Sequence, residues 1–174
     1  ITLSQNQTKQ MDDRDNPFYE YDLLGILKSA FLPMVYVRAS KECPLLVEYS
    51  KFARRIGAIA CYAYLGDVTE SVTGDKKAQK FEDEYLEELL QELMKYGIKA
   101  VTYMPTRNTR EQIFRLRELC KKYGMLQISG EDVNSPRQSF VIKAMEDPIF
   151  SNLIDSTWAL IRHEQGEEHI NLGD

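Results

Sequence analysis

Three short apolar runs, separated by amphipathic stretches, constrain the fold of this chain more than any other feature. They cover residues 58–65 (AIACYAYL), 98–104 (IKAVTYM) and 125–129 (MLQIS). Such nearly continuous apolar character is typical of strands that are buried on both faces of a parallel sheet. Strand, helix, strand, helix, strand with short connections is the pattern of βαβ units. The sequence therefore predicts an α/β fold with parallel strands.

The stretches between the runs show the start and stop signals of helices. Thr109 and Gln112 form a T-x-x-Q capping box, in which each side chain accepts a hydrogen bond from an unpaired backbone N–H. Gly97 and Gly124 are suited to end the two helices. The apolar stripes predicted for these helices are Phe81, Tyr85, Leu89 and Leu93 with Leu86 and Leu90 beside them, and then Ile113, Leu116, Leu119, Cys120 and Tyr123.

Weaker patterns flank this region and divide the chain into three parts. We expect a flexible lead-in over residues 1–17, one domain over 18–162 and a frayed tail over 163–174. Within the domain, the spacing predicts a helix over 19–31, a strand over 34–37, helices over 140–145 and 149–162, and a solvated charged face over 82–88. Two further apolar stripes are predicted, Leu45, Tyr49, Phe52 and Ile56 in a helix with Leu46 and Ala53 beside them, and Ile154, Trp158 and Ile161 in the core.

Charge and cysteine content exclude several classes of protein. Lys and Arg number 22 against 27 Asp and Glu, so the net charge is −5. This acidic balance argues against non-specific binding to nucleic acid or to an anionic membrane. The three cysteines, Cys43, Cys61 and Cys120, are an odd number without metal-binding spacing, which indicates reduced thiols in the cytoplasm. No run has the ~18 to 20 apolar residues of a membrane span, and since Ile1 is not a Met, we expect a longer product.

Polar loops follow all three predicted strands. The loop over 130–137 (GEDVNSPR) is the densest, and it contains Asp132, Asn134 and Arg137. Parallel strands end at one edge of a sheet, so we expect Asp132, Asn134, Tyr64, Asp67 and Arg107 in one cleft. Such a cleft would hold a hard cation and an anionic group, although turn formation alone also explains these residue types. The other loop candidates are Glu70, Ser71, Thr73, Asn108 and Thr109.

Residues 97–136 (GIKAVTYMPTRNTREQIFRLRELCKKYGMLQISGEDVNSP) resemble the C-terminal part of the PHP domain, named for polymerase and histidinol phosphatase. Residues 129–134 (SGEDVN) resemble the family motif G-S-D-F-H, and residues 63–66 (AYLG) resemble A-H-P-G. The resemblance covers about residues 57–138. It implies the C-terminal part of a distorted (β/α)7 barrel, a TIM-like barrel whose active site holds up to three divalent metals.

The resemblance also implies roles for individual residues. Asp132 matches a metal-binding Asp, while the family's late His falls on Asn134 and the His of A-H-P falls on Tyr64. Oxygen ligands of this kind bind zinc, manganese or iron less well than imidazole does. The family's H-x-H motif is absent, because His163 and His169 are the only histidines and their spacing indicates a solvated tail.

The function that follows from the resemblance is hydrolysis of a phosphate ester by water on a divalent zinc, manganese or iron ion. Asp132 and Asn134 would be the catalytic residues, with Asp132 as metal ligand. Arg107, Arg137, Tyr64 and Asp67 would bind a phosphorylated small molecule.

Two alternatives stay open at this point, a PHP-derived binding or regulatory module that has lost its metals, and a βα-barrel enzyme that uses no metal. Three secure strands are about half a barrel. We therefore expect a partner, either the missing N-terminal half or a second copy, and no hydrolase activity from this chain alone.

Overall fold

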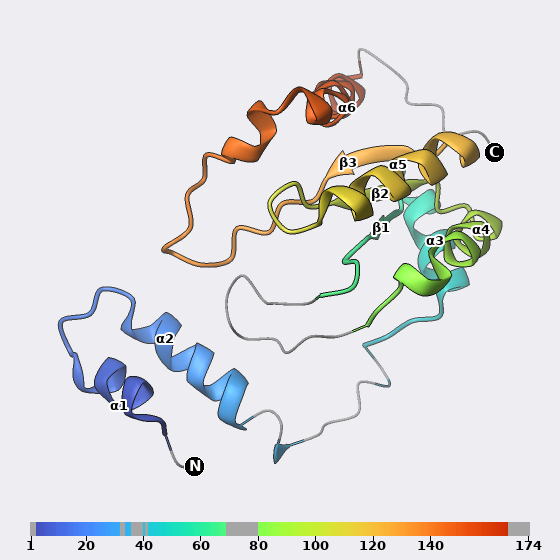
Figure 1. The fold of residues 1–174 in the computed structure, drawn as a ribbon. Coiled ribbons are helices and arrows are strands. Elements are labelled where there is room, and N and C mark those ends of the chain that lie inside the picture. The colour runs from blue at the N-terminus through green and yellow to red at the C-terminus, as the bar shows by residue number, and fades with distance from the viewer. Residues whose placement is uncertain (1–2, 32–33, 36–39, 41, 69–79, 167–174) are drawn as a thin grey trace.

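The described residues form a three-stranded parallel sheet that lies near α5 (Arg110–Tyr123) and α6 (Ser151–Glu164) (Figure 1). The computed structural model of the protein describes residues 3–31, 34–35, 40, 42–68 and 80–166. Strand β1 (Cys61–Ala63) pairs with β2 (Ala100–Tyr103), and β2 pairs with β3 (Leu126–Ser129), so the order in the sheet follows the order in the chain. The predicted α/β fold with parallel strands is confirmed, with strands shorter than the apolar runs.

Two helices connect the strands, α4 (Leu86–Lys95), which follows a short 3-10 turn η3 (Asp83–Tyr85), and α5 (Arg110–Tyr123). The predicted capping box of α5 is present, since Thr109 Oγ1 accepts from Gln112 N and Gln112 Oε1 accepts from Thr109 N. Gly124 ends α5 in the left-handed conformation, with φ 64°. Local sequence signals therefore set both ends of α5.

The hydrophobic core lies on one face of the sheet. Side chains alternate along a strand, and those of Tyr62, Tyr64, Val101 and Tyr103 all contact this core. On the opposite face Ala100 is fully buried, whereas Ala63 is exposed and Leu126 and Ile128 are half-buried. The prediction that the strands are buried on both faces is therefore wrong for the described residues. The helices contribute Leu86, Leu90, Leu93, Ile113, Leu116, Leu119, Cys120, Phe150 and Leu153 to the same core.

The buried stripe of α4 differs from the predicted one. Leu86, Leu90 and Leu93 are buried, whereas Tyr85 is exposed and Leu89 is half-buried. The helix begins at Leu86, so residues 81–85 do not continue its periodicity. The predicted solvated face over 82–88 is wrong at its start, because the Glu82 side chain is buried.

The described residues before β1 include three α-helices. Helix α1 (Gln5–Asp12) has a capping box between Ser4 and Gln7, and it lies within the expected lead-in, whose flexibility stays a prediction. Helix α2 (Tyr19–Ile26) continues into the π-helical turn η1 (Leu27–Phe31), close to the predicted helix over 19–31. The predicted strand over 34–37 lies partly outside the described residues.

Helix α3 (Leu46–Arg55) lies beside the C-terminal end of α4 (Figure 1). It makes contact there through Ser50, whose hydroxyl donates to the carbonyl of Tyr96, and it buries Ala53. Its apolar stripe is instead exposed, and consists of Leu45, Tyr49, Phe52 and Ile56.

After β3, the chain forms two 3-10 turns, η4 (Lys143–Glu146) and η5 (Pro148–Phe150), and then α6 (Ser151–Glu164). The predicted helix over 140–145 is wrong, and Asp147 begins η5 by accepting from Ile149 N. Trp158 was predicted in the core but is 57% exposed, and Ile154 and Ile161 are exposed with it. Helix α6 reaches the core through Leu153 instead.

Among the described helices, none combines the length and the apolar character that crossing a membrane requires.

Substitutions on α5 test which face of this helix packs against the core. Leu116 is 0% exposed, so Leu116→Ala leaves a cavity and is expected to lower the free energy of unfolding by about 2 to 5 kcal/mol. Phe114 on the same helix is 49% exposed, and Phe114→Ala should cost about 1 kcal/mol or less. Urea titrations of both variants measure the two losses in the free energy of unfolding. Equal losses would contradict the burial of only one face of α5.

Candidate functional site

The loops that follow the three strands lie at one edge of the sheet. Because β1, β2 and β3 are parallel, their carboxyl ends share that edge. Tyr64 N donates to Thr102 O over 2.9 Å, and Gly130 N donates to Tyr103 O over 2.8 Å, which continues the pairing into the loops. The candidate residues after β1, β2 and β3 thus come from one rim of the sheet.

A buried carboxylate closes the turn after β1. Glu82 is 5% exposed, and its Oε1 accepts from Leu65 N over 2.6 Å and from Gly66 N over 2.7 Å. The Tyr62 hydroxyl donates to the other oxygen. Gly66 has φ +70°, and a Cβ there would lie 2.7 Å from Gln112 Nε2, so the turn requires glycine. Glu82 therefore has a structural role in holding this turn.

Asp67 and Asp83 hold each other's loops. Asp67 Oδ1 accepts from Phe81 N over 2.8 Å, and Asp67 N donates to Asp83 Oδ2 over 3.0 Å. Gln112 Nε2, from the capping box of α5, donates to the same Asp83 oxygen over 2.7 Å. The Tyr64 hydroxyl donates to the other oxygen, Oδ1. These bonds join the β1 loop to the beginnings of α4 and α5.

The side chains of Tyr64 and Asp67, which were expected in the cleft, are instead hydrogen-bonded within the fold. The Tyr64 side chain belongs to the core, where burial and then the bond to Asp83 raise the pKa of its hydroxyl. Burial also acts to raise the pKa of Asp83, but hydrogen bonds from Tyr64, Gln112 and Asp67 N outweigh it and leave that pKa below its ordinary value. The substrate-binding role predicted for Tyr64 and Asp67 would require these bonds to break.

Asn108 connects the loops after β1 and β2. Its Oδ1 accepts from Met104 N over 2.9 Å, and its Nδ2 donates to Leu65 O over 2.9 Å. The side chain is buried, so this candidate from the second loop stabilises the fold and is not presented to a ligand.

The loop after β3 is internally hydrogen-bonded and keeps its acidic tip exposed. Glu131 accepts from Thr106 N over 2.7 Å and from Thr106 Oγ1 over 2.6 Å, which ties this loop to the β2 loop. Asp132 Oδ2 accepts from Asn134 Nδ2 over 2.9 Å, and both side chains are exposed. Gln138 Oε1 accepts from the backbone N–H of Asn134 and of Ser135. Asp132 and Asn134 are therefore neighbours that face solvent.

The two candidate arginines differ in their partners. Arg107 is half-buried, and its guanidinium donates no hydrogen bond to another described residue. Arg137 instead binds the carboxylate of Asp22 on α2 through both ends of its fork, at 2.7 and 2.9 Å. This pairing joins residues 115 positions apart, which no local sequence pattern reveals.

Asp22 is held as an anion beneath Arg137. Its side chain is 7% exposed, and Asn16 Nδ2 donates to its Oδ2 over 2.7 Å. The bond from Arg137 and then the bond from Asn16 lower the pKa of Asp22 below its ordinary value. The guanidinium of Arg137 also lies 4.6 Å from the centre of the Phe18 ring.

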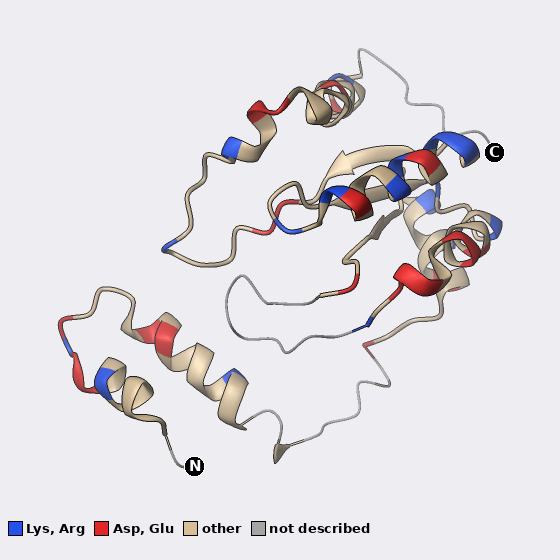
Figure 2. Cartoon of the chain, viewed as in Figure 1, with Lys and Arg blue, Asp and Glu red and all other residues tan. Residues whose placement is uncertain are grey.

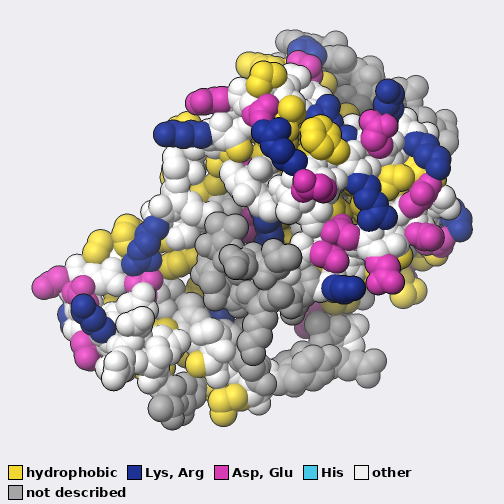
Figure 3. All heavy atoms as spheres, viewed as in Figure 1, with side chains coloured by type: hydrophobic (Ala, Val, Ile, Leu, Met, Phe, Trp, Pro, Cys, Tyr) yellow, Lys and Arg dark blue, Asp and Glu magenta, His cyan; other side chains and the backbone are white. Residues whose placement is uncertain are grey.

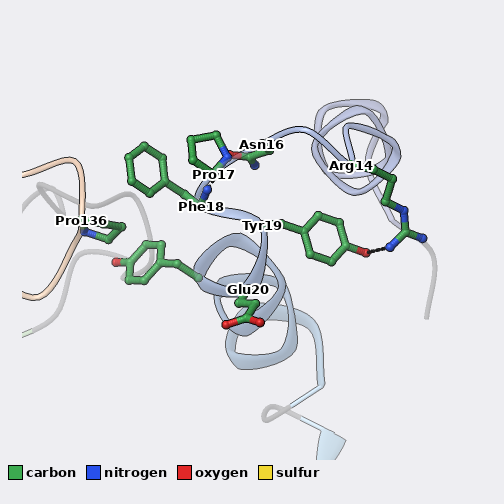
Figure 4. A pocket seen from close by; sticks show the side chains of 8 residues that line it. Arg14, Asn16, Pro17, Phe18, Tyr19, Glu20 and Pro136 are labelled. Atoms are coloured by element: carbon green, nitrogen blue, oxygen red, sulfur yellow. Dashed lines mark hydrogen bonds between the residues drawn. The ribbon is translucent and has the colours of Figure 1, made fainter.

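A shallow pocket of about 640 Å³ (Figure 4) is lined by Asn16 and Phe18, which also contact this ion pair. Its aromatic lining includes Phe18 and Tyr19, and Arg14 Nη1 donates to the Tyr19 hydroxyl over 2.8 Å. Pro136, from the loop after β3, lines the opposite side. The pocket therefore lies between the residues before β1 and the loop that carries Arg137.

No three His, Cys, Asp or Glu side chains of the described residues are grouped so that they would hold a metal ion. Asp132 contributes one carboxylate, and Asn134 one amide. His163 lies in α6, while Glu70, Ser71, Thr73 and His169 lie outside the described residues. Burial raises the pKa of the Cys61 thiol to about 11 and of the Cys120 thiol to about 12, consistent with packing thiols.

No protein-family model matches the chain, and no curated protein or solved structure resembles it at a significant level.

Removing the Glu82 carboxylate tests its role in the turn after β1. Glu82→Ala leaves two backbone N–H groups and a hydroxyl without their acceptor, and we expect a loss of about 3 kcal/mol in the free energy of unfolding. Exposed Glu84 on the same turn is the matched control, and Glu84→Ala should stay within about 0.5 kcal/mol. Chemical denaturation distinguishes the two, and a neutral Glu82→Ala would refute this role.

Asp83 makes stability depend on pH in acid. Its pKa in the fold is below the ordinary 3.8, so its stabilising contribution is complete above about pH 4 and is lost as pH falls through the folded pKa. Thermal unfolding of wild type and Asp83→Asn between pH 7 and pH 2 measures this. The difference between the two should shrink as the pH falls, and a constant difference would contradict the assignment.

Proposed function

We propose that this chain is the C-terminal portion of a PHP-like, metal-dependent phosphoesterase with a TIM-like barrel. The supporting observation is a parallel sheet whose strand order follows the chain, with its core on one face. In a (β/α) barrel all helices pack outside, and the opposite face of the strands lines the interior. The second face of this sheet carries small and β-branched residues, including Ala63, Ala100 and Thr102, which suit such an inner wall.

The exposed side chains on the rim suit recognition of a phosphate ester. The guanidinium of Arg107 donates no hydrogen bond to the part of the chain that the structure describes. Its two N–H ends match the spacing of two phosphate oxygens. Asp132 and Asn134 face solvent from the loop after β3. In this proposal Arg107 binds the substrate phosphate, and the Asn134 amide orients Asp132.

The described residues do not form a complete metal site by themselves. Asp132 would contribute one oxygen ligand to a zinc, manganese or iron ion, and further ligands would come from the rest of the barrel. When bound, such an ion lowers the pKa of a coordinated water and so supplies a nucleophile near neutral pH.

The surface charge favours a small substrate over a polymer. Helix α4 carries mainly Glu, whereas α5 carries mainly Lys and Arg (Figure 2), and neither sign forms a continuous field on the face seen in Figure 3. A protein that binds nucleic acid or an anionic membrane through charge needs a surplus of basic side chains. We therefore infer a phosphorylated small molecule as substrate. The three cysteines, an odd number without metal-binding spacing, support the cytoplasm as location.

A second candidate function is a PHP-derived module that binds or regulates without catalysis. The hydrogen bonds of Tyr64 and Asp67 and the ion pair of Arg137 favour it, because half of the expected site residues are engaged within the fold. The metal content of the protein distinguishes the two candidates, since a module that has lost its ligands takes up no stoichiometric metal.

A completing partner is part of the proposal. Within the described residues, β1 and β3 each pair with one strand only, so each has an open edge. Exposed apolar stripes also lie on two helices, Leu45, Tyr49, Phe52 and Ile56 at α3, and Ile154, Trp158 and Ile161 on α6. The first half of a barrel, or a second copy of the chain, would cover such surfaces.

Metal content and ester hydrolysis test the proposed function. The polypeptide that contains this chain and the completing half should bind zinc, manganese or iron and hydrolyse a generic phosphate monoester, whereas this chain alone should not. Less than one equivalent of metal after supplementation, or turnover by this chain as a monomer, would overturn the proposal.

Variants of that polypeptide test the individual residues. Asp132→Ala should abolish hydrolysis, and Arg107→Ala should lower kcat/KM about 10- to 100-fold, as expected for the loss of a charged hydrogen bond. Asp155→Ala, on the exposed side of α6, is the matched control and should leave turnover and folding unchanged. Wild-type turnover by Asp132→Ala would remove Asp132 from the mechanism.

A further inference from the structure

Residues 4–31, which comprise α1, α2 and η1, form a helical strap that does not share the core of the sheet. Within the described residues, none of its side chains belongs to that core, and α1 buries no residue at all. Helix α2 buries only Asp22 and Ile26. Four apolar side chains of the strap are exposed, Leu23, Leu24, Leu27 and Phe31. Figure 1 shows α1 and α2 apart from the sheet.

The strap meets the loop after β3 mainly through Arg137. Both Nη groups donate to the Asp22 carboxylate, at 2.7 and 2.9 Å, and the guanidinium lies over the Phe18 ring. Asn16 holds the same carboxylate from within the strap. The ion pair between Arg137 and Asp22, with its two hydrogen bonds, is therefore the main polar interaction at this contact.

The seam around this contact is open. A pocket is lined by Phe18 on the strap, which the Arg137 guanidinium covers, and by Pro136 on the loop (Figure 4). The Arg137 side chain is 45% exposed, whereas the Asp22 side chain is 7% exposed. Solvent and small ions therefore reach Arg137 without prior unfolding of the sheet.

We propose that a phosphate group competes with Asp22 for Arg137 and thereby releases the strap. The inference deepens the proposed function and rests on it for the identity of the anion. A carboxylate bound by both ends of a guanidinium occupies the positions that two phosphate oxygens take in the same fork. Asp22 thus acts as an internal substitute for the ligand, and the docked strap is the state without phosphate.

Because the two equilibria are linked, this competition can be measured through phosphate binding and through docking of the strap. If phosphate binds Arg137 only when the strap is undocked, docking weakens phosphate binding by the same factor by which phosphate weakens docking. Helix α2 has 8 residues, and an isolated helix of that length is marginal in water. Its amide protection therefore reports docking.

Hydrogen exchange of the full chain tests the release. In wild type, inorganic phosphate should raise exchange over residues 19–26, while sodium chloride at equal ionic strength should raise it less, because screening alone weakens the pair only in part. Phenyl phosphate is the second ligand. Release by both ligands assigns recognition to the phosphate group, and release by the ester alone assigns it to the substrate.

Variants distinguish an ion pair that phosphate can displace from one that has only a structural role. Asp22→Asn should raise exchange over 19–26 without ligand and tighten binding of inorganic phosphate about tenfold, whereas Arg137→Gln should raise exchange and abolish that binding. Glu87→Gln removes the ion pair with Lys122 between α4 and α5 and should change neither quantity. Circular dichroism confirms that each variant is folded.

Two results would overturn the proposal. One is unchanged exchange over 19–26 in both Asp22→Asn and Arg137→Gln, which would show that this pair does not hold the strap. The other is raised exchange in those variants with no response of wild type to either phosphate ligand, which would leave the pair as a structural clamp. Exchange requires neither metal nor turnover, so a failure of the phosphoesterase assay is a separate result.

Discussion

Burial of one face of the parallel sheet is the constraint on which the rest of this structure depends. Strand order that follows chain order allows α4 and α5 to return on the same side, where leucines of both helices meet Val101 and Tyr103. The same arrangement brings every loop after a strand to one edge. The position of the core and the position of the candidate site therefore both follow from the topology of the sheet, and so does the partial exposure of its second face.

The rim is held mainly by polar contacts that act across loops. Glu82, Asp83 and Asn108 accept or donate hydrogen bonds between segments that are far apart in the sequence, and buried backbone groups of the turns depend on them. This network explains why acidic residues at the start of α4 are not simply solvated. It also leaves a small set of groups for chemistry, since the described side chains of Asp132, Asn134 and Arg107 make no hydrogen bond to another loop or helix.

The ion pair between Asp22 and Arg137 gives the loop after β3 two possible roles. In the structure it anchors residues 4–31, and in the proposed competition the same guanidinium would bind a phosphate group once Asp22 is displaced. Both roles use the same fork geometry, so they exclude each other at any one moment. Arg137 can therefore hold residues 4–31 in one state of the protein and bind phosphate in another.

Local sequence was sufficient for features that depend on neighbours in the chain. The parallel α/β pattern, the Thr109–Gln112 capping box and the end of α5 at Gly124 were all predicted, because period and cap chemistry act within a few residues. Only the tertiary structure decided which apolar stripe is buried, so Trp158 is exposed although its spacing indicated core. It alone also paired Arg137 with Asp22 and turned Tyr64 and Asp67 inward, since contacts between distant segments leave no periodic trace in the sequence.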